Sequence, residues 1–279
     1  MTDAQDRWEA RLAEHTVYRR PGGGPAVVLL NGCGLASVAW DAVVEALPGR
    51  AIIAVDRPGR CGTVNDGLPD LRQEARILSR IIGDDAPAIV VAHSMSSFQA
   101  EALARLHPQA VSGIVLADPA VEASAHSGRL RRAGAASIAR ALGSAVRAEP
   151  VRRVAAAAIR YGMRHETSHP EALDDELWRA CHDTPEALAA SAAELASYGG
   201  QAADLAALRA EQAAPAAAPA ILLEGKPFHP AGQEETLEAA FSHLEIRRVP
   251  QSRHLMMLDA PEEIARAVDD LGTAAAPEA

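Results

Sequence analysis

A single serine stands where this sequence could place a nucleophile. In IVVAHSMSSFQAE (residues 89–101), Ser94 lies between a run of β-branched residues and a stretch with a helical pattern. A chain that passes from strand to helix so abruptly must turn tightly. Such a turn lifts a serine hydroxyl above the edge of a sheet if the residues two before and two after it are small. Ala92 and Ser96 are both small. A serine that only caps the following helix is the alternative interpretation.

A serine hydroxyl needs a neighbouring base to accept its proton before it can attack a substrate. The sequence offers ten histidines, and His254 lies between the last predicted strand (244–249) and a helix that begins at Pro261. His93 adjoins the serine in the chain, but successive side chains of a strand point to opposite faces. The alternation therefore speaks against His93 and leaves His254 as a candidate for the base.

Short runs rich in branched residues alternate with helical patterns at both ends of the chain, and these elements must position the serine and the histidine. Such runs are typical of buried parallel strands. The predicted strands are residues 26–31, 51–56, 88–93, 113–118, 220–225 and 244–249, with an earlier one at 14–20. The predicted helices are residues 38–46, 70–82, 96–106, 234–242 and 261–271. The alternation predicts an α/β fold with a doubly wound, mostly parallel sheet.

The strand pattern stops between residues 118 and 219, where alanine-rich stretches take over. Two of them begin with a proline followed by a glutamate, at Pro170 and Pro185, which is typical of a helix start. The following boundaries are therefore predicted: a core of residues 1–120 and 215–272, an all-helical insertion of residues 121–214 after the sixth strand, and a disordered tail of residues 273–279.

The chain is acidic, with a formal net charge of −10, which argues against nucleic acid as a partner because a phosphate-binding surface needs a basic excess. Residues 129–164 are the exception, with nine arginines against one acid, Glu149. This segment could bind an anionic acyl group, a coenzyme A phosphate or an acidic acyl carrier protein. A solvated surface that pairs with the acidic helices at residues 171–194 is the alternative.

Nothing in the sequence predicts a membrane segment, because no apolar run approaches the roughly 20 residues that a membrane helix needs. Residues 1–15 carry charges from the third residue on, unlike a signal peptide, so we expect a cytoplasmic protein without membrane contact. The cysteines Cys33, Cys61 and Cys181 show no paired spacing. We expect free thiols, with neither a disulfide framework nor a metal site.

Four motifs occur in the order in which the α/β-hydrolase family carries them, and the chain resembles that family over nearly all of its length except the insertion. They are LLNGCG (29–34), VDRPGRCGT (55–63), AHSMSS (92–97) and SRHLMMLDAPEEI (252–264). The resemblance implies that Ser94 is the nucleophile on a relaxed form of the Gly-x-Ser-x-Gly turn. It implies that His254 is the base, because the family carries its base between the last strand and the following helix. It also implies that the insertion forms a lid above the serine and that the loop at 56–60 is architectural.

The resemblance further implies an oxyanion hole made of two backbone N–H groups, those of Cys33 and Met95. Such donors stabilise the negative charge that develops in an acyl-transfer transition state. Where most relatives have His-Gly, this chain has Asn31 and Gly32. The glycine still allows the loop to bend toward a ligand.

The acid that would complete a serine triad departs from the family pattern. The family most often places it at the third position after the glycine that ends the seventh strand, and here that position is Phe228. Two carboxylates remain in range, Asp118 at the end of the sixth strand and Glu224 just before the glycine. Many haloalkane dehalogenases carry the acid after the sixth strand, which favours Asp118. A dyad of serine and histidine, or an impaired site, remains open.

The serine at the turn sets the expected reaction, because the epoxide hydrolases and dehalogenases of the family carry an aspartate there. We expect hydrolysis of an ester, thioester or lactone of a small organic substrate through an acyl-serine intermediate, without a cofactor. Two alternatives stay open. One is a biosynthetic thioesterase or cyclase acting on a carrier-bound acyl group, and the other is a non-hydrolytic lyase or ligand receptor on the same fold.

Overall fold

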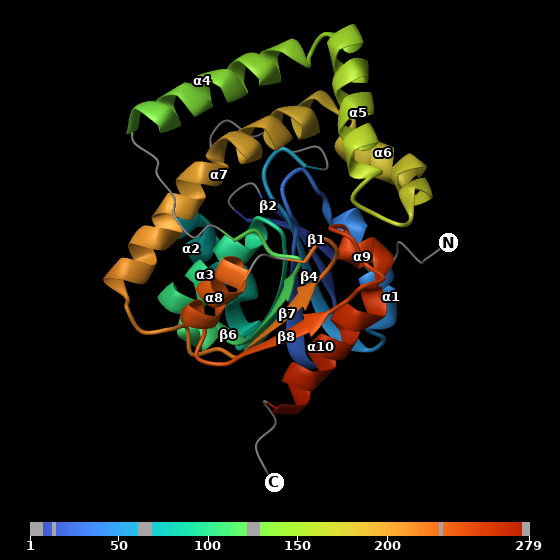
Figure 1. Ribbon diagram of the computed structural model, residues 1–279. Coiled ribbons are helices and arrows are strands. Elements are labelled where there is room, and N and C mark those ends of the chain that lie inside the picture. Colours follow the sequence, from blue (N-terminus) through green and yellow to red (C-terminus); the bar gives the residue numbers. More distant parts are fainter. Residues whose placement is uncertain (1–7, 13–14, 61–68, 122–128, 229–230, 275–279) are drawn as a thin grey trace.

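An eight-stranded sheet runs through the centre of the computed structural model, which describes residues 8–12, 15–60, 69–121, 129–228 and 231–274 (Figure 1). The strand order is β1-β2-β4-β3-β5-β6-β7-β8, with β1 and β2 antiparallel at one edge and β3 to β8 parallel. The doubly wound, mostly parallel sheet predicted from the sequence is confirmed. The strands are β1 (Trp8–Leu12), β2 (His15–Arg20), β3 (Gly23–Leu30), β4 (Arg50–Asp56), β5 (Ala88–His93), β6 (Val111–Ala117), β7 (Ala220–Glu224) and β8 (Leu244–Arg248).

The central strands are apolar throughout because both faces of the sheet are covered by helices. In β3, Val28 and Leu30 pack into one core, while Val27 and Leu29 pack into the other. The first core lies under α2 (Leu71–Ile82), α3 (Ser96–Leu106) and α8 (Ala231–Ala240). The second lies under α1 (Asp41–Ala46), α9 (Met256–Asp259) and α10 (Pro261–Ala274). This arrangement brings the carboxyl ends of the parallel strands to one edge, where ligands of such sheets bind.

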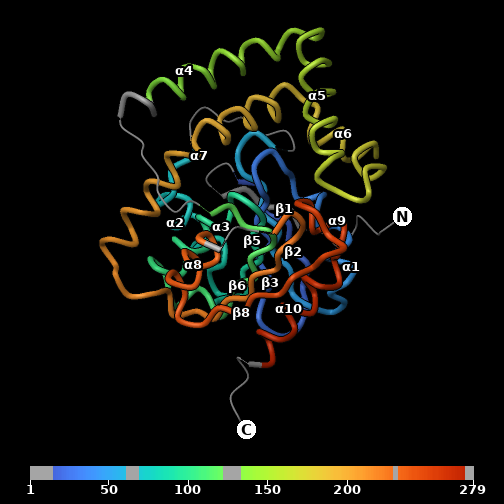
Figure 2. The backbone as a smooth tube through the Cα atoms, viewed as in Figure 1, coloured from blue at the N-terminus to red at the C-terminus, as the bar shows by residue number. Residues whose placement is uncertain are grey.

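Helices make up the chain between β6 and β7 from residue 129 to residue 211. They are α4 (Arg129–Ala145), α5 (Glu149–Met163), α6 (Glu176–His182) and α7 (Pro185–Glu211), with a short 3-10 helix at Pro170–Asp174. Figure 2 shows that this part of the chain lies above the carboxyl edge of the sheet. At the start of α7, the Thr184 hydroxyl accepts a hydrogen bond from the Ala187 N–H at 3.1 Å, as an N-cap does. The division into core and insertion at residues 120 and 215 stays a prediction.

Three details differ from the sequence predictions. β1 is an additional strand, whose residues alternate between apolar and charged with the period of two that suits an edge strand. The tail predicted to be disordered from residue 273 is wrong at its start, because α10 continues to Ala274. Its last residues, 275–279, lie outside the described part. The helix predicted at 38–46 begins as a 3-10 helix, Ser37–Trp40, before α1.

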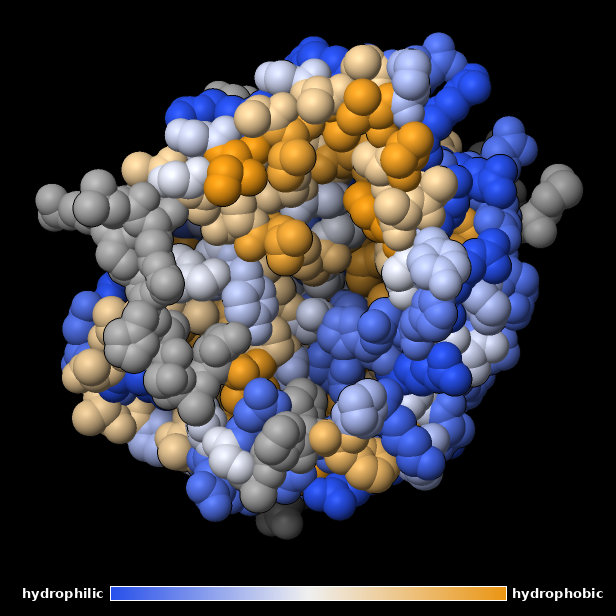
Figure 3. Space-filling view, turned by 45° about the horizontal axis from the view of Figure 1, so that its top comes forward, coloured by the Kyte–Doolittle hydropathy of each residue, from blue (hydrophilic) through white to orange (hydrophobic). Residues whose placement is uncertain are grey.

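The helices above the sheet carry much of the exposed hydrophobic surface. Figure 3 shows hydrophobic residues along these helices, at the edge of a hollow in this face of the molecule. Exposed residues of this kind are Ile138, Leu142, Val151, Val154, Tyr161 and Leu195. Among the helices of the described ranges, none combines the length and the apolar character required to cross a membrane.

Candidate active site

Ser94 lies on a tight turn between β5 and α3. Its φ of 52° is in the left-handed region, which residues other than glycine rarely adopt. Three main-chain hydrogen bonds hold it there: the Ser94 N–H donates to the Ala117 carbonyl at 3.3 Å, and the Ser94 carbonyl accepts from the N–H groups of Ser97 and Ala120, both at 3.0 Å. The structure thus places a strained turn at the carboxyl end of a central strand, with the serine at its apex.

A serine replaces the second glycine of the usual turn without leaving a buried polar group unsatisfied. Ser96 is fully buried. Its hydroxyl lies 2.9 Å from the Leu30 carbonyl oxygen and 2.8 Å from the His93 carbonyl oxygen, either of which can accept its proton. Ala92, the other small residue of the turn, is also fully buried. The relaxed motif is therefore compatible with close packing between α3 and the end of β3.

His254 and Asp118 complete a hydrogen-bonded chain that ends at the serine. His254 Nε2 lies 3.1 Å from Ser94 Oγ, and His254 Nδ1 lies 2.5 Å from Asp118 Oδ2. An ionised carboxylate can only accept hydrogen bonds, so Nδ1 must carry the proton. Nε2 is then free to accept the proton of the serine hydroxyl, which is the tautomer that nucleophilic catalysis requires.

The backbone of Asp118 is strained in the same way as that of Ser94. Its φ is 45°, directly after β6. Its second carboxylate oxygen, Oδ1, accepts a hydrogen bond from the Gly225 N–H at 3.1 Å. A Cβ added to Gly225 would lie 2.6 Å from the Arg253 carbonyl oxygen, so only glycine allows the histidine loop to pass this close. Asp118 and His254 are thus held on neighbouring, closely packed segments.

Of the two acids that the sequence left open, Glu224 pairs with Arg248, whereas Asp118 binds His254. The Glu224 side chain is fully buried, and its Oε2 lies 3.3 Å from Arg248 Nε. Arg248 also lies over the ring of Phe228, with Cζ 5.0 Å from the ring centroid. The position where the family most often carries its acid is therefore occupied by a packing contact, and the structure brings Asp118 to His254 instead.

His93, which the sequence analysis weighed only as a possible base, is a neighbour of His254. The two imidazole rings lie 4.6 Å apart, and His93 Nε2 lies 2.8 Å from the His254 carbonyl oxygen, so Nε2–H donates there. Burial, and secondarily the proximity of His254, holds the pKa of His93 well below its usual value. His93 therefore stays neutral and holds the backbone of His254. Only its position beside the serine in the sequence hinted at this role.

The loop after β3 passes next to the serine. A Cβ added to Gly32 would lie 3.1 Å from Ser94 Cβ and 2.4 Å from His93 Nδ1, so this close approach requires glycine. Among the described residues, no protein acceptor pairs with the backbone N–H of Cys33 or of Met95. Both amides predicted for an oxyanion hole therefore have no hydrogen-bond acceptor among the described residues and could donate to a ligand.

Asn31 serves the architecture of this loop. Its Nδ2 donates to the Val55 carbonyl at 3.0 Å and to Asp56 Oδ1 at 2.8 Å, and its Oδ1 accepts from Trp40 Nε1 at 2.7 Å. Asp56 also accepts a hydrogen bond from the Ser37 hydroxyl at 2.9 Å. Asn31 and Asp56 therefore join the ends of β3 and β4, as expected for an architectural loop, and Trp40 is a buried packing residue.

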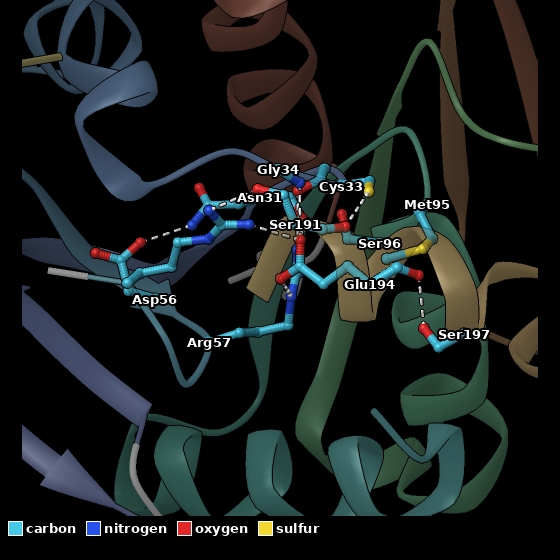
Figure 4. Close-up of polar contacts among 12 residues, drawn as sticks. Asn31, Cys33, Gly34, Asp56, Arg57, Met95, Ser96, Ser191, Glu194 and Ser197 are labelled. Atoms are coloured by element: carbon cyan, nitrogen blue, oxygen red, sulfur yellow. Dashed lines mark hydrogen bonds and ion pairs between the residues drawn. The ribbon is translucent and has the colours of Figure 1, made fainter. Parts of the chain in front are cut away.

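Arg57 connects the same loop to the insertion, which the sequence did not reveal. Its guanidinium group binds Glu194 of α7, with 2.8 Å between Nε and Oε1. Arg60 binds the other carboxylate oxygen, with 2.8 Å between Nη2 and Oε2. Figure 4 shows Glu194 reaching from α7 toward Gly34 and Arg57. All three charged side chains are buried.

The thiol of Cys33 is not a competing nucleophile. Burial, and then the negative charge of Glu194, raises the pKa of Cys33 to about 12, so the thiol stays protonated at neutral pH. Neither Cys33 nor Cys181 forms a disulfide, while Cys61 lies outside the described residues. Within the described ranges, no group of three or more His, Cys, Asp or Glu side chains is arranged to hold a metal ion.

His182 anchors α6 to Ala36, which follows the loop after β3. Its Nδ1–H donates to the Trp178 carbonyl at 2.8 Å, and its Nε2 accepts from the Ala36 N–H at 3.0 Å. The Trp178 ring stacks on the imidazole at 4.3 Å and is itself buried. Burial, opposed by the bond to Trp178 and assisted by the charge of Arg60, lowers the pKa of His182 from 6.5 to about 4.

This shift predicts a loss of stability on mild acidification. Between pH 6.5 and about 4, the unfolded chain protonates residue 182 while the folded protein keeps His182 neutral, so the free energy of unfolding falls as the pH falls. The shift corresponds to roughly 3 kcal/mol in total. Urea unfolding across this range should show a shallower pH dependence for His182→Gln than for the unchanged protein. If the free energy of unfolding depended equally on pH in both proteins, a lowered pKa of His182 would be contradicted.

Solved structures with a similar fold cover nearly all of the chain. A "putative epoxide hydrolase" from Pseudomonas aeruginosa is 18% identical with a TM-score of 0.72, covering 96% of this chain and 95% of that one. An alpha/beta hydrolase fold protein from Burkholderia ambifaria is 22% identical, with a TM-score of 0.72 and coverage of 97% and 98%. A thermophilic esterase from Thermogutta terrifontis is 21% identical, with a TM-score of 0.68 and coverage of 95% and 97%.

These likenesses show the fold, and the family is shown by the sequence itself. No curated protein sequence matches the chain. The model of the alpha/beta hydrolase family, however, matches residues 27–267, from within β3 to the first half of α10. This stretch includes the turn at Ser94, the loop after β3 and the segment that carries His254. The chain therefore belongs to the alpha/beta hydrolase family.

Proposed function

We propose that this protein hydrolyses a carboxylic ester, thioester or lactone of a small organic substrate through an acyl-serine intermediate. The observation that carries the proposal is the hydrogen-bonded chain from Asp118 through His254 to Ser94. A serine, a base and an orienting carboxylate in this geometry are recognised by their arrangement on many folds. In this proposal Ser94 is the nucleophile, His254 the base and Asp118 the acid.

The reaction begins when Ser94 Oγ attacks the carbonyl carbon while its proton passes to His254 Nε2. Asp118 stabilises the imidazolium that forms. Collapse of the tetrahedral intermediate breaks the bond to the leaving group, which takes the proton from Nε2 and departs as an alcohol or thiol. A water molecule then attacks the acyl-serine with His254 again as the base, and the acid product and the free serine are released.

The negative charge of the tetrahedral intermediate needs backbone donors beside the serine. The N–H groups of Cys33 and Met95 are suited to this, because neither pairs with an acceptor among the described residues. The close approach of Gly32 to Ser94 brings the loop to the nucleophile. Donors placed in advance are the largest single contribution in many acyl-transfer enzymes.

Ester chemistry fits this site better than epoxide chemistry, although one structural neighbour is named as an epoxide hydrolase. The residue at the turn is Ser94, whereas the family's epoxide hydrolases carry an aspartate there. A neighbour of comparable identity is named as an esterase. The exposed hydrophobic residues on α4, α5 and α7, which lie above the carboxyl edge of the sheet, support a substrate with an apolar group.

The arginines of residues 129–164 give little support to an acyl carrier partner. Arg160 and Arg164 form ion pairs with Asp183 and Asp174, and Arg153 pairs with the nearby Glu149. Such contacts agree with the alternative of a charged surface that pairs with the acidic helices. The carrier-bound substrate and the cytoplasmic location remain predictions from the sequence.

A fluorophosphonate probe tests the proposal directly. An activated serine attacks phosphorus, so that an Oγ–P bond forms, the P–F bond breaks and fluoride leaves. We expect the folded protein to gain one phosphonyl group, located by mass spectrometry on the peptide that contains Ser94, and the heat-denatured protein to gain none. The absence of labelling, together with no turnover across a panel of esters and thioesters, would favour a ligand receptor or a lyase instead.

A further inference from the structure

A buried cluster of three charged residues lies behind the loop at residues 31–34, called the oxyanion loop below because it carries the Cys33 N–H. The reaction described above does not use this cluster. Glu194 is 1% exposed, Arg57 5% and Arg60 0%. Burial alone would raise the pKa of Glu194, but the positive charges of Arg57 and Arg60 lower it to about 2, so the cluster is ionised at neutral pH. Well-packed hydrophobic residues would often stabilise a fold as much as buried ion pairs do. Stability alone therefore does not explain why these charged residues are buried here, and their contacts with the loop indicate another role.

Both members of one ion pair hold the backbone on either side of Cys33. Arg57 Nη1 donates to the Asn31 carbonyl at 2.7 Å, and Nη2 donates to the Gly32 carbonyl at 2.8 Å. On the other side, Glu194 Oε2 accepts a hydrogen bond from the Gly34 N–H at 2.7 Å. The two peptide units that flank the Cys33 Cα are thus each held by one partner of the pair.

Because the peptide bond is planar, these contacts fix the direction of the Cys33 N–H. The Gly32 carbonyl and the Cys33 N–H belong to one rigid trans unit, in which C=O and N–H point in opposite directions. Because Arg57 binds the Gly32 carbonyl, the Cys33 N–H must point away from Arg57. The fixed Gly34 N–H prevents the following unit from rotating in compensation. Since Gly32 packs against Ser94, the loop presents this N–H beside the nucleophile.

We propose that Arg57 and Glu194 are positioning residues that orient the Cys33 N–H of the oxyanion hole. This inference rests on the function proposed above and adds a role for the insertion. Because Glu194 belongs to α7, the insertion supplies part of the support for the hole as well as covering the site. Neither residue touches the reacting atoms in this scheme, and each acts only through the loop at residues 31–34.

A second buried cluster provides a matched control. Glu101 of α3 is 2% exposed and also binds two arginines, with 2.8 Å to Arg105 Nε and 2.6 Å to Arg209 Nη2. Like the first cluster, it joins the core to α7, because Arg209 lies on that helix. Arg105 also donates to backbone carbonyls, which are those of Gln212, Ala214 and Ala240, away from the oxyanion loop.

The test compares Glu194→Gln with Glu101→Gln. Each change keeps the shape of a buried side chain and removes its charge. In Glu194→Gln the amide group can accept through one oxygen only, so its NH₂ group must face one of the donors that the carboxylate now binds. We expect kcat to fall at least about tenfold with KM changed less than about twofold, since even complete loss of an oxyanion donor costs about 10²- to 10³-fold. Glu101→Gln should change kcat less than twofold.

Hydrogen exchange provides a readout that needs no substrate and so separates this inference from the proposed function. Amides of the peptide that spans residues 31–35 should exchange faster in Glu194→Gln and at the wild-type rate in Glu101→Gln. Equal kcat losses in the two variants, or unchanged exchange of the loop in Glu194→Gln, would overturn the inference. If the wild-type protein is inactive toward esters and the probe, the proposed function fails, while the exchange comparison still decides whether the pair holds the loop.

A second pair of variants covers the case in which Glu194→Gln does not fold. Arg57→Lys keeps the positive charge beside Glu194, but an ammonium group cannot span Glu194 and both carbonyls as the guanidinium fork does. Arg105→Lys makes the same change in the control cluster, where Arg105 also binds a carboxylate and backbone carbonyls. A fall in kcat and faster loop exchange are expected for Arg57→Lys alone, and equal effects in both would contradict the inference.

Discussion

Replacing Ser94 by alanine should abolish turnover while the protein remains folded. The change removes the hydroxyl that would form the proposed acyl intermediate, and loss of a triad nucleophile has cost about 10⁶-fold in turnover in a well-studied protease. We expect a loss of at least about 10⁴-fold here. The fold should survive because alanine is as small as the turn requires and occupies the left-handed backbone at a cost similar to that of serine. Steady-state kinetics and thermal unfolding measure the two effects.

Ser97 supplies the control for this experiment. It is a buried serine on α3, the helix that follows the turn, and its hydroxyl donates to the Ala120 carbonyl at 2.9 Å. Ser97→Ala should lower the free energy of unfolding by about 1 kcal/mol through the lost hydrogen bond and leave most of the activity. A folded Ser94→Ala variant with more than about a hundredth of wild-type activity would show that another residue is the nucleophile.

The fold was predictable because its signals are local. Each central strand is a short apolar run, and each such run in the sequence became a strand between β3 and β8. β1 was missed although Trp8, Ala10 and Leu12 alternate with charged residues, because a pattern of five residues is too short to separate from a helical turn. The predicted tail began two residues too early because helix ends such as that of α10 carry weak signals.

The candidate site was predictable only where a side chain follows directly from its place on a strand. Ser94 and His254 could be chosen from the turn and from the segment after β8. Only the resemblance to haloalkane dehalogenases favoured Asp118 over Glu224, because both end neighbouring strands and the left-handed backbone that turns Asp118 toward the histidine leaves no mark on the sequence. The sequence shows which residues lie at the carboxyl edge of the sheet, but it does not show which way their side chains point.

Glu194 could not be predicted at all. It lies 160 residues from Gly34, within an alanine-rich helix where a single glutamate looks like a solvated residue. Only the packing of α7 over the loop brings it beside Arg57. Glu194 is buried beside two arginines only in the folded chain, and no local sequence motif indicates this contact.

Asp118→Asn should lower turnover at least about a hundredfold without unfolding the protein. Asparagine suits this position because it tolerates the left-handed backbone that Asp118 adopts at φ 45°. Its Oδ1 can still accept the Gly225 N–H, so the change isolates the charge and the face toward His254. There the Asn amide would present N–H to Nδ1, which must then become the acceptor, and Nε2 would carry the proton toward Ser94. A serine that faces Nε2–H has no base, and in a known triad the same exchange costs about 10⁴-fold.

Glu224→Gln completes the experiment, because it changes the other carboxylate that the sequence offered. Glu224 is fully buried near Arg248, so the loss of its charge should lower the melting temperature. The value of kcat should stay close to that of the wild-type protein. A crippled Glu224→Gln beside a nearly silent Asp118→Asn would move the acid to the seventh strand. If both variants kept most of their activity, Ser94 and His254 would act as a dyad, since the hydrogen bond from His93 to the His254 carbonyl would then suffice to hold the base.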